Sequence, residues 1–135
     1  MVKENKLTLI PKTEKYIEYM LNVIQKMPRT EKFNIGTEYK TSMYKMLKNV
    51  MYISKINEKN KILELINEID AELNTQRIYL RIMQENKWID TKKFEVAIGL
   101  IYEMGKIIGG LIEKNIINNT YINNFFCNIF FVTFT

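Results

Sequence analysis

The sequence predicts an all-α fold, an antiparallel up-and-down four-helix bundle, over residues 1–115, followed by a separate tail over residues 116–135. Apolar residues recur at spacings of three and four along four successive segments. No proline follows Pro28, so long helices are permitted through most of the chain. The connections between the segments are short, which makes neighbouring helices antiparallel.

The first two helices are predicted from their apolar faces and from the residues that punctuate them. The first begins near Pro11, where proline is tolerated at a helix start, and ends before Pro28. Its apolar face consists of Tyr16, Met20, Val23, Ile24 and Met27. The second follows Gly36 and ends around Asn57. Its face consists of Tyr39, Met43, Met46, Leu47, Val50 and Ile53.

The last two helices are predicted to be longer. The third covers about residues 58–86 and repeats close to heptad spacing, as bundles require. Its apolar face consists of Ile62, Leu65, Ile66, Ile69, Leu73, Leu80 and Met83. The fourth opens at Asp90 or Thr91, both good N-caps. Its face consists of Phe94, Ala97, Ile98, Ile101, Met104, Ile108, Leu111 and Ile112.

The tail differs from the rest of the chain. Residues 115–135 carry no charge and contain six asparagines and five of the seven phenylalanines. The densest apolar run, residues 125–135, is shorter than the roughly 20 residues that a membrane-spanning helix needs, so no membrane contact is predicted. Two interpretations stay open: a β-prone segment that packs on the bundle or on a neighbouring subunit, or a segment without function.

Composition excludes several kinds of chemistry. The chain has no histidine, the commonest general base and metal ligand. Its single cysteine, Cys127, cannot form an internal disulfide, which together with an N-terminus that lacks a signal peptide indicates the cytoplasm. Glu64, Glu68 and Glu72 align on one helix face, which we interpret as a solvated acidic face rather than a metal site. We therefore expect no catalytic residues, no metal, no cofactor and no enzyme activity.

Basic residues supply the candidate binding sites, and the net charge of +5 favours polyanionic partners. Arg77 and Arg81 are i,i+4 neighbours whose planar forks suit phosphate or carboxylate. We expect them to lie on a polar face and to matter for binding RNA or a protein but hardly for folding; the alternative is pairing with acidic neighbours on the same helix. The remaining contact candidates are Arg29, Lys32, Lys92 and Lys93.

A second basic group lies on the second helix. Lys45, Lys48 and Lys55 share a face with Tyr52, an aromatic ring on which a base of single-stranded RNA or DNA can stack. The alternative is an ordinary solvated surface.

Three glycines interrupt the fourth helix. Gly105, Gly109 and Gly110 remove side chains from one side, which lets another backbone approach closely, so we interpret them as oligomer-packing residues. A phosphate-binding loop would place glycines before a helix start rather than inside an apolar repeat.

Four motifs resemble the accessory variability determinant (Avd) family: IPKTEKY at 10–16, KMPRTEKFNIG at 26–36, LNTQRIYLR at 73–81 and MGKIIGGLIEK at 104–114. The resemblance covers roughly residues 7–114. It implies a homopentameric, positively charged barrel of four-helix bundles. Such a barrel binds the reverse transcriptase of a diversity-generating retroelement and its template RNA, and it supports error-prone copying into a variable gene.

Two other hypotheses stay open. The chain is also similar to four-helix proteins encoded within ribosomal RNA intervening sequences, but those proteins carry Ile-Ala-Glu-Gly where this chain has residues 57–60, Asn-Glu-Lys-Asn. The remaining hypothesis is a purely structural bundle that oligomerises without contacting nucleic acid.

Overall fold

The computed structural model describes the backbone of residues 2–115 and the side chains of residues 8–114. Its elements are α1 (Val2–Gln25), α2 (Arg29–Phe33), α3 (Ile35–Ile53), α4 (Lys59–Glu85) and α5 (Thr91–Asn115). Every element in this part of the chain is a helix, which confirms the predicted all-α class. The tail predicted over residues 116–135 lies outside the described residues.

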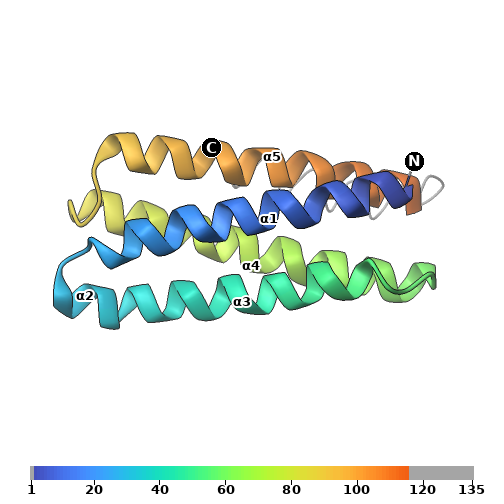
Figure 1. Cartoon of the computed structure of the whole chain (residues 1–135), viewed down its shortest axis with the longest axis horizontal. Helices are drawn as coiled ribbons and strands as arrows, with labels where there is room; N and C mark the ends of the chain where they lie inside the picture. Colours follow the sequence, from blue (N-terminus) through green and yellow to red (C-terminus); the bar gives the residue numbers. More distant parts are fainter. Residues whose placement is uncertain (1, 116–135) are drawn as a thin grey trace.

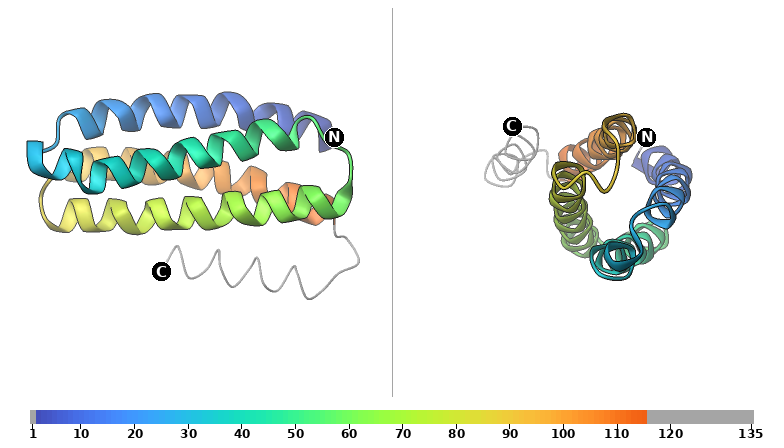
Figure 2. Two further views of the ribbon diagram at one scale, coloured as in Figure 1. Left: turned by 90° about the horizontal axis from the view of Figure 1, so that it is seen from below. Right: turned by 90° about the vertical axis from the view of Figure 1, so that its left-hand side faces the viewer.

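The four long helices form an up-and-down bundle (Figure 1), as predicted. Viewed along the bundle, they form a ring in which α1 and α4 each pack against both α3 and α5 (Figure 2). The short helix α2 and the α4–α5 connection lie at the same end of the bundle, which we call the α2 end. Within residues 2–115, none of the helices has the length and apolar character needed to cross a membrane.

Two features of the N-terminal half differ from the prediction. The predicted start of the first helix near Pro11 is wrong, because α1 begins at Val2 and contains Pro11 in its interior. An interior proline costs about 3 kcal/mol, and the fully buried Leu9 and Tyr16 on either side of it supply the packing that offsets this cost. The helix α2 was not predicted; the backbone N–H of Lys32 donates to the Pro28 carbonyl at 2.8 Å to form its turn.

The other helices begin and end close to their predicted positions, although α3 ends at Ile53 rather than near Asn57. The first turn of α5 is capped as predicted, since Asp90 Oδ1 accepts the backbone N–H of Lys93 at 2.8 Å. Gly36 lies in the first turn of α3 rather than before it. A Cβ at Gly36 would lie 2.9 Å from Ile24 Cγ2, so glycine lets α3 approach α1 closely there.

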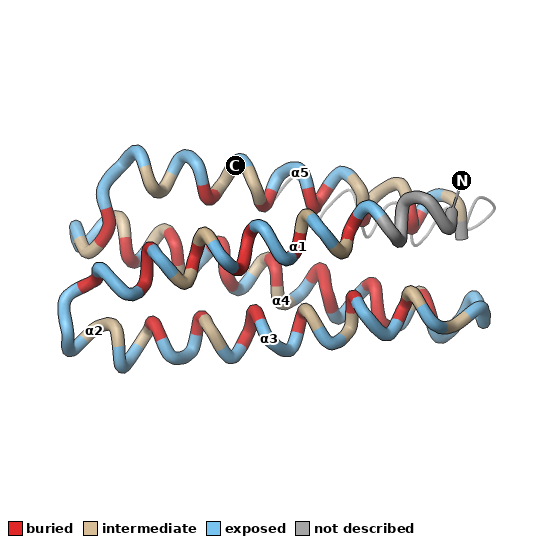
Figure 3. Tube along the Cα trace, viewed as in Figure 1, coloured by how far each residue is buried: buried red, intermediate tan, exposed pale blue. Residues whose placement is uncertain are grey.

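The four predicted apolar faces meet in one core (Figure 3). Their members are buried apart from three that are half-buried: Leu47, Phe94 and Ile98. Burying a large aliphatic or aromatic side chain contributes about 1.5–3 kcal/mol relative to exposure. The apolar periodicity of the sequence therefore determines the bundle.

Candidate nucleic-acid and protein interface

An exposed strip along α3 combines lysines with aromatic rings, and we call it the α3 ridge: Tyr44, Lys45, Lys48, Tyr52 and Lys55. The expectation that all three lysines share one helix face is wrong for Lys55, because α3 ends at Ile53 and Lys55 lies in the turn that follows. The rings of Tyr52 and Tyr44 are 56% and 43% exposed, so Tyr44 adds a second aromatic surface that the sequence analysis missed. Its signal was its position, four residues before Lys48 on the same helix face. Lysines that alternate with exposed rings are the side chains that single-stranded nucleic acids contact.

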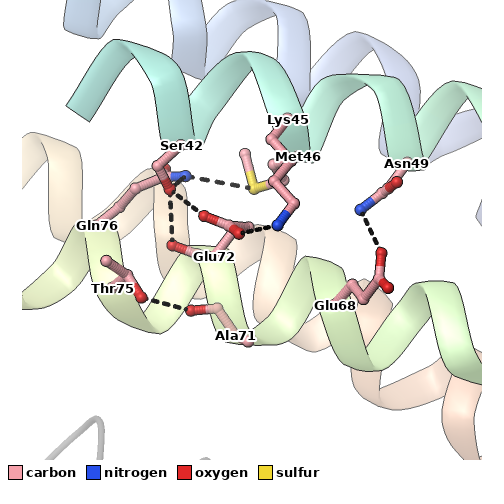
Figure 4. A network of polar contacts seen from close by, with 9 residues as sticks. All are labelled: Ser42, Lys45, Met46, Asn49, Glu68, Ala71, Glu72, Thr75 and Gln76. Carbon is pink, nitrogen blue, oxygen red and sulfur yellow. Dashed lines mark hydrogen bonds and ion pairs between the residues drawn. The ribbon is translucent and has the colours of Figure 1, made fainter. Parts of the chain in front are cut away.

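Lys45 differs from the other lysines of the ridge. Its Nζ lies 3.2 Å from Glu72 Oε2, so it joins α3 to α4 (Figure 4). The Glu72 side chain is only 19% exposed, which corrects the interpretation of Glu72 as part of a solvated acidic face. No ion pair engages Lys48 or Lys55 among the described side chains.

A polar network that the sequence analysis missed lies behind the ridge and connects three helices. Ser42 Oγ donates to Glu72 Oε1 at 2.8 Å and accepts from Gln76 Nε2 at 2.9 Å (Figure 4). Gln76 Oε1 accepts the hydroxyl of Tyr16 at 2.7 Å, and the Tyr16 hydroxyl also bonds to that of Tyr39. Because the Tyr16 hydroxyl donates its only proton to Gln76, the hydrogen bond between the two tyrosines must be donated by Tyr39.

The donors of this network therefore run in one direction, from Tyr39 through Tyr16, Gln76 and Ser42 to the Glu72 carboxylate. Loss of solvation on burial is the largest cause that raises the pKa of Tyr16 and of Tyr39, so both hydroxyl groups keep their protons. Hydrogen bonds aligned in this way polarise and strengthen one another in a low-dielectric interior. The network fixes the register of α1, α3 and α4.

Arg77 and Arg81 do not share a polar face, and that expectation is wrong for Arg77. Arg77 is 5% exposed, whereas Arg81 is half-buried. Burial, followed by the nearby charge of Arg81, lowers the pKa of the Arg77 guanidinium. The position follows from heptad spacing, since Arg77 lies seven residues after Asp70, which is also buried, along the edge of the apolar face of α4. A role of either arginine in partner binding stays a prediction.

Arg77 should consequently contribute to folding. We expect Arg77→Ala to lower the free energy of unfolding by about 2 kcal/mol, because the packing of its buried aliphatic stem is lost. Arg81→Ala is the matched control, with an expected change below about 0.5 kcal/mol. Denaturant unfolding measures both values. An unchanged midpoint for Arg77→Ala would show that this arginine contributes nothing to stability.

The structure brings the remaining contact candidates to the α2 end. Arg29 and Lys32 belong to α2, and Lys92 and Lys93 to the first turn of α5. Lys32 is half-buried, and its Nζ donates to the Gln25 carbonyl at 3.4 Å, so part of its role is to cap α1. Arg29 and Lys92 are exposed.

The glycines of α5 lie where the sequence placed them, with Gly105 buried and Gly109 and Gly110 half-buried. Their role in oligomer packing stays a prediction. In the part of the chain that the structure describes, no group of acidic or cysteine side chains is arranged to hold a metal ion.

Comparison with known proteins gives one finding. A model of the bAvd-like family matches residues 7–115, which is most of the chain. No match was found among curated proteins or among solved structures.

Proposed function

Because the chain belongs to the bAvd-like family, we propose that it is a non-enzymatic accessory protein of a diversity-generating retroelement. In this role it binds the reverse transcriptase and the template RNA, and the partner carries out the chemistry of mutagenic copying. The family match over residues 7–115 is the observation that carries the proposal.

The α3 ridge supports the RNA part of the proposal. Lys48 and Lys55 are exposed and engage no ion pair among the described side chains, so both are available to phosphates. Tyr44 and Tyr52 offer rings beside them on which bases can stack. Such a surface binds the backbone of a single strand with little preference for sequence.

The α5 glycines support the assembly part. The half-buried, side-chain-free positions at Gly109 and Gly110 suit close contact with the backbone of a second subunit, whereas Gly105 is already buried within one chain; we propose a cyclic homopentamer. Five copies of a chain with net charge +5 would carry about +25, which would strengthen the attraction for RNA well beyond that of one subunit.

RNA binding by this surface should depend steeply on salt. For a single strand, the slope of log K against log salt is about −0.7 for each phosphate neutralised. The variant Lys48→Ala should therefore weaken binding of a single-stranded RNA about fivefold at 0.1 M salt and flatten the slope by about 0.7. Fluorescence anisotropy of labelled RNA across a salt series measures both quantities.

The ridge provides its own control. Lys45→Ala removes the same charge, but Lys45 is already paired with Glu72, so we expect a smaller loss of RNA affinity. Light scattering should give the same pentameric mass for both variants as for the unchanged protein. Salt-independent binding, or a monomer at micromolar concentration, would instead favour a bundle without the proposed role.

The reverse transcriptase part has a separate check. We expect the enzyme of a diversity-generating retroelement to copurify with this protein, and we expect its gene and a paired template/variable repeat to lie beside the gene of this chain.

A further inference from the structure

A cavity of about 570 Å³ opens at the α2 end of the bundle, between the end of α1, the end of α4 and the start of α5. This volume is in the usual range for small-ligand sites. We call it the α2-end pocket and define it by the lining residues that carry the argument: Lys26, Lys87, Trp88, Asp90 and Lys93.

The lining combines three lysines with one large aromatic side chain and two carboxylates, Asp90 and the exposed Glu85, so its formal charge is still positive. Lys26 and Lys87 are exposed, and neither takes part in an ion pair among the described side chains. Asp90 offsets part of the positive charge, since it lies 3.9 Å from Lys93 Nζ, but its other oxygen caps α5. The indole of Trp88 is half-buried and forms an aromatic wall. Cations beside an aromatic wall suit a phosphate joined to a planar base.

Lys87 occupies a backbone conformation that lysine rarely adopts. Its φ is 62°, in the left-handed region. The backbone N–H of Lys87 donates to Gln84 and that of Trp88 donates to Met83, which is the helix-ending pattern that favours glycine at this position. A lysine is therefore held, at a cost in stability, at a position that lines the cavity.

We propose that the α2-end pocket binds one nucleotide of single-stranded RNA, with the phosphate near Lys26, Lys87 and Lys93 and the base against Trp88. The choice of RNA rests on the proposed function. Arg29, in α2, and Lys92, in the first turn of α5, are exposed at the same end of the bundle and offer further phosphate contacts to the strand.

The chain provides its own reporter, because Trp88 is the only tryptophan. Adding a short oligoadenylate to the full-length protein should quench the Trp88 fluorescence. The variant Lys87→Gly should bind the oligonucleotide about fivefold more weakly at 0.1 M salt, since one phosphate contact is lost. The same variant should melt about 2–4 °C higher, since glycine relieves the left-handed strain.

A loss of affinity together with a gain in stability separates a binding role of Lys87 from a structural one. The control Lys15→Ala removes an exposed charge on α1 and should leave the quenching unchanged. Unaltered affinity and quenching in Lys87→Gly and Lys26→Ala, while Lys48→Ala still weakens RNA binding, would overturn the pocket and leave the proposed function standing.

Two further outcomes have distinct meanings. If the unchanged protein binds no oligoadenylate at any salt, both the pocket and the RNA role fail. If adenosine monophosphate quenches Trp88 at the same concentration as the oligonucleotide, the pocket serves a free nucleotide and the assignment to a strand is overturned.

Discussion

Replacing Gln76 by leucine should lower the free energy of unfolding by about 3 kcal/mol, although leucine is close in size and apolar. Gln76 is fully buried and accepts the Tyr16 hydroxyl while donating to Ser42. Without Gln76, the hydroxyls of Tyr16 and Tyr39 can bond only to each other, so the proton of one buried hydroxyl has no acceptor. Such a group costs about 1–3 kcal/mol, and the bond to Ser42 is lost as well. Urea unfolding with circular dichroism measures the change.

The direction of the network supplies the control for this prediction. Removing both hydroxyls in Tyr16→Phe with Tyr39→Phe, on top of Gln76→Leu, should restore much of the lost stability, because no tyrosine donor is then left unsatisfied. The effects of the three changes should therefore be strongly non-additive. If the triple variant loses the sum of the separate effects, the aligned chain of donors is wrong.

The core was predictable because burial of apolar side chains dominates folding and leaves a helical period in the sequence. Met43, Met46 and Val50 show this on α3, since their spacing alone places them on the buried face. The starts of helices were less predictable. Proline normally interrupts a helix, but α1 continues through Pro11 because residues on both sides of it pack against the rest of the bundle.

The buried polar side chains of α4 were not predicted, because polar residues are expected to be exposed to solvent. On α4 the apolar series passes from Leu73 to Leu80 with one heptad position missing, and Gln76 fills it. Asp70 and Arg77, seven residues apart, are buried along the edge of the same series. The gap and the repeat are visible in the sequence, but only the partners on α1 and α3 explain why polar side chains are stable there.

The α3 ridge was partly predictable. Lys45, Lys48 and Tyr52 are exposed as the helical spacing implied, because the side opposite an apolar face is solvated, whereas Lys55 lies beyond the end of α3. The pairing of Lys45 with Glu72 depends on the register between α3 and α4, which no pattern within one helix contains.

The buried carboxyl group of Asp70 should make the stability of the protein depend on pH. Its side chain is 8% exposed, and loss of solvation raises its pKa to about 6, against a smaller lowering by the hydrogen bond from Asn74. The folded state therefore holds this proton more tightly than the unfolded chain does. Between about pH 4 and pH 6 the folded state binds more protons, so the free energy of unfolding falls as the pH rises.

Replacing Asp70 by asparagine should therefore stabilise the protein at pH 7, by up to about 3 kcal/mol, and change little at pH 4. The magnitude follows from a pKa shift of about two units at 1.36 kcal/mol each, and asparagine avoids the cost of a buried charge while retaining a polar side chain. Thermal unfolding of both proteins from pH 4 to pH 7 measures the difference, which should grow with pH.

The control is Glu64→Gln, which changes an exposed carboxylate on the same helix and should show no such growth with pH. Destabilisation by Asp70→Asn at pH 7 would instead mean that a cation balances the charge of the buried carboxylate, so that ionised Asp70 stabilises the folded state.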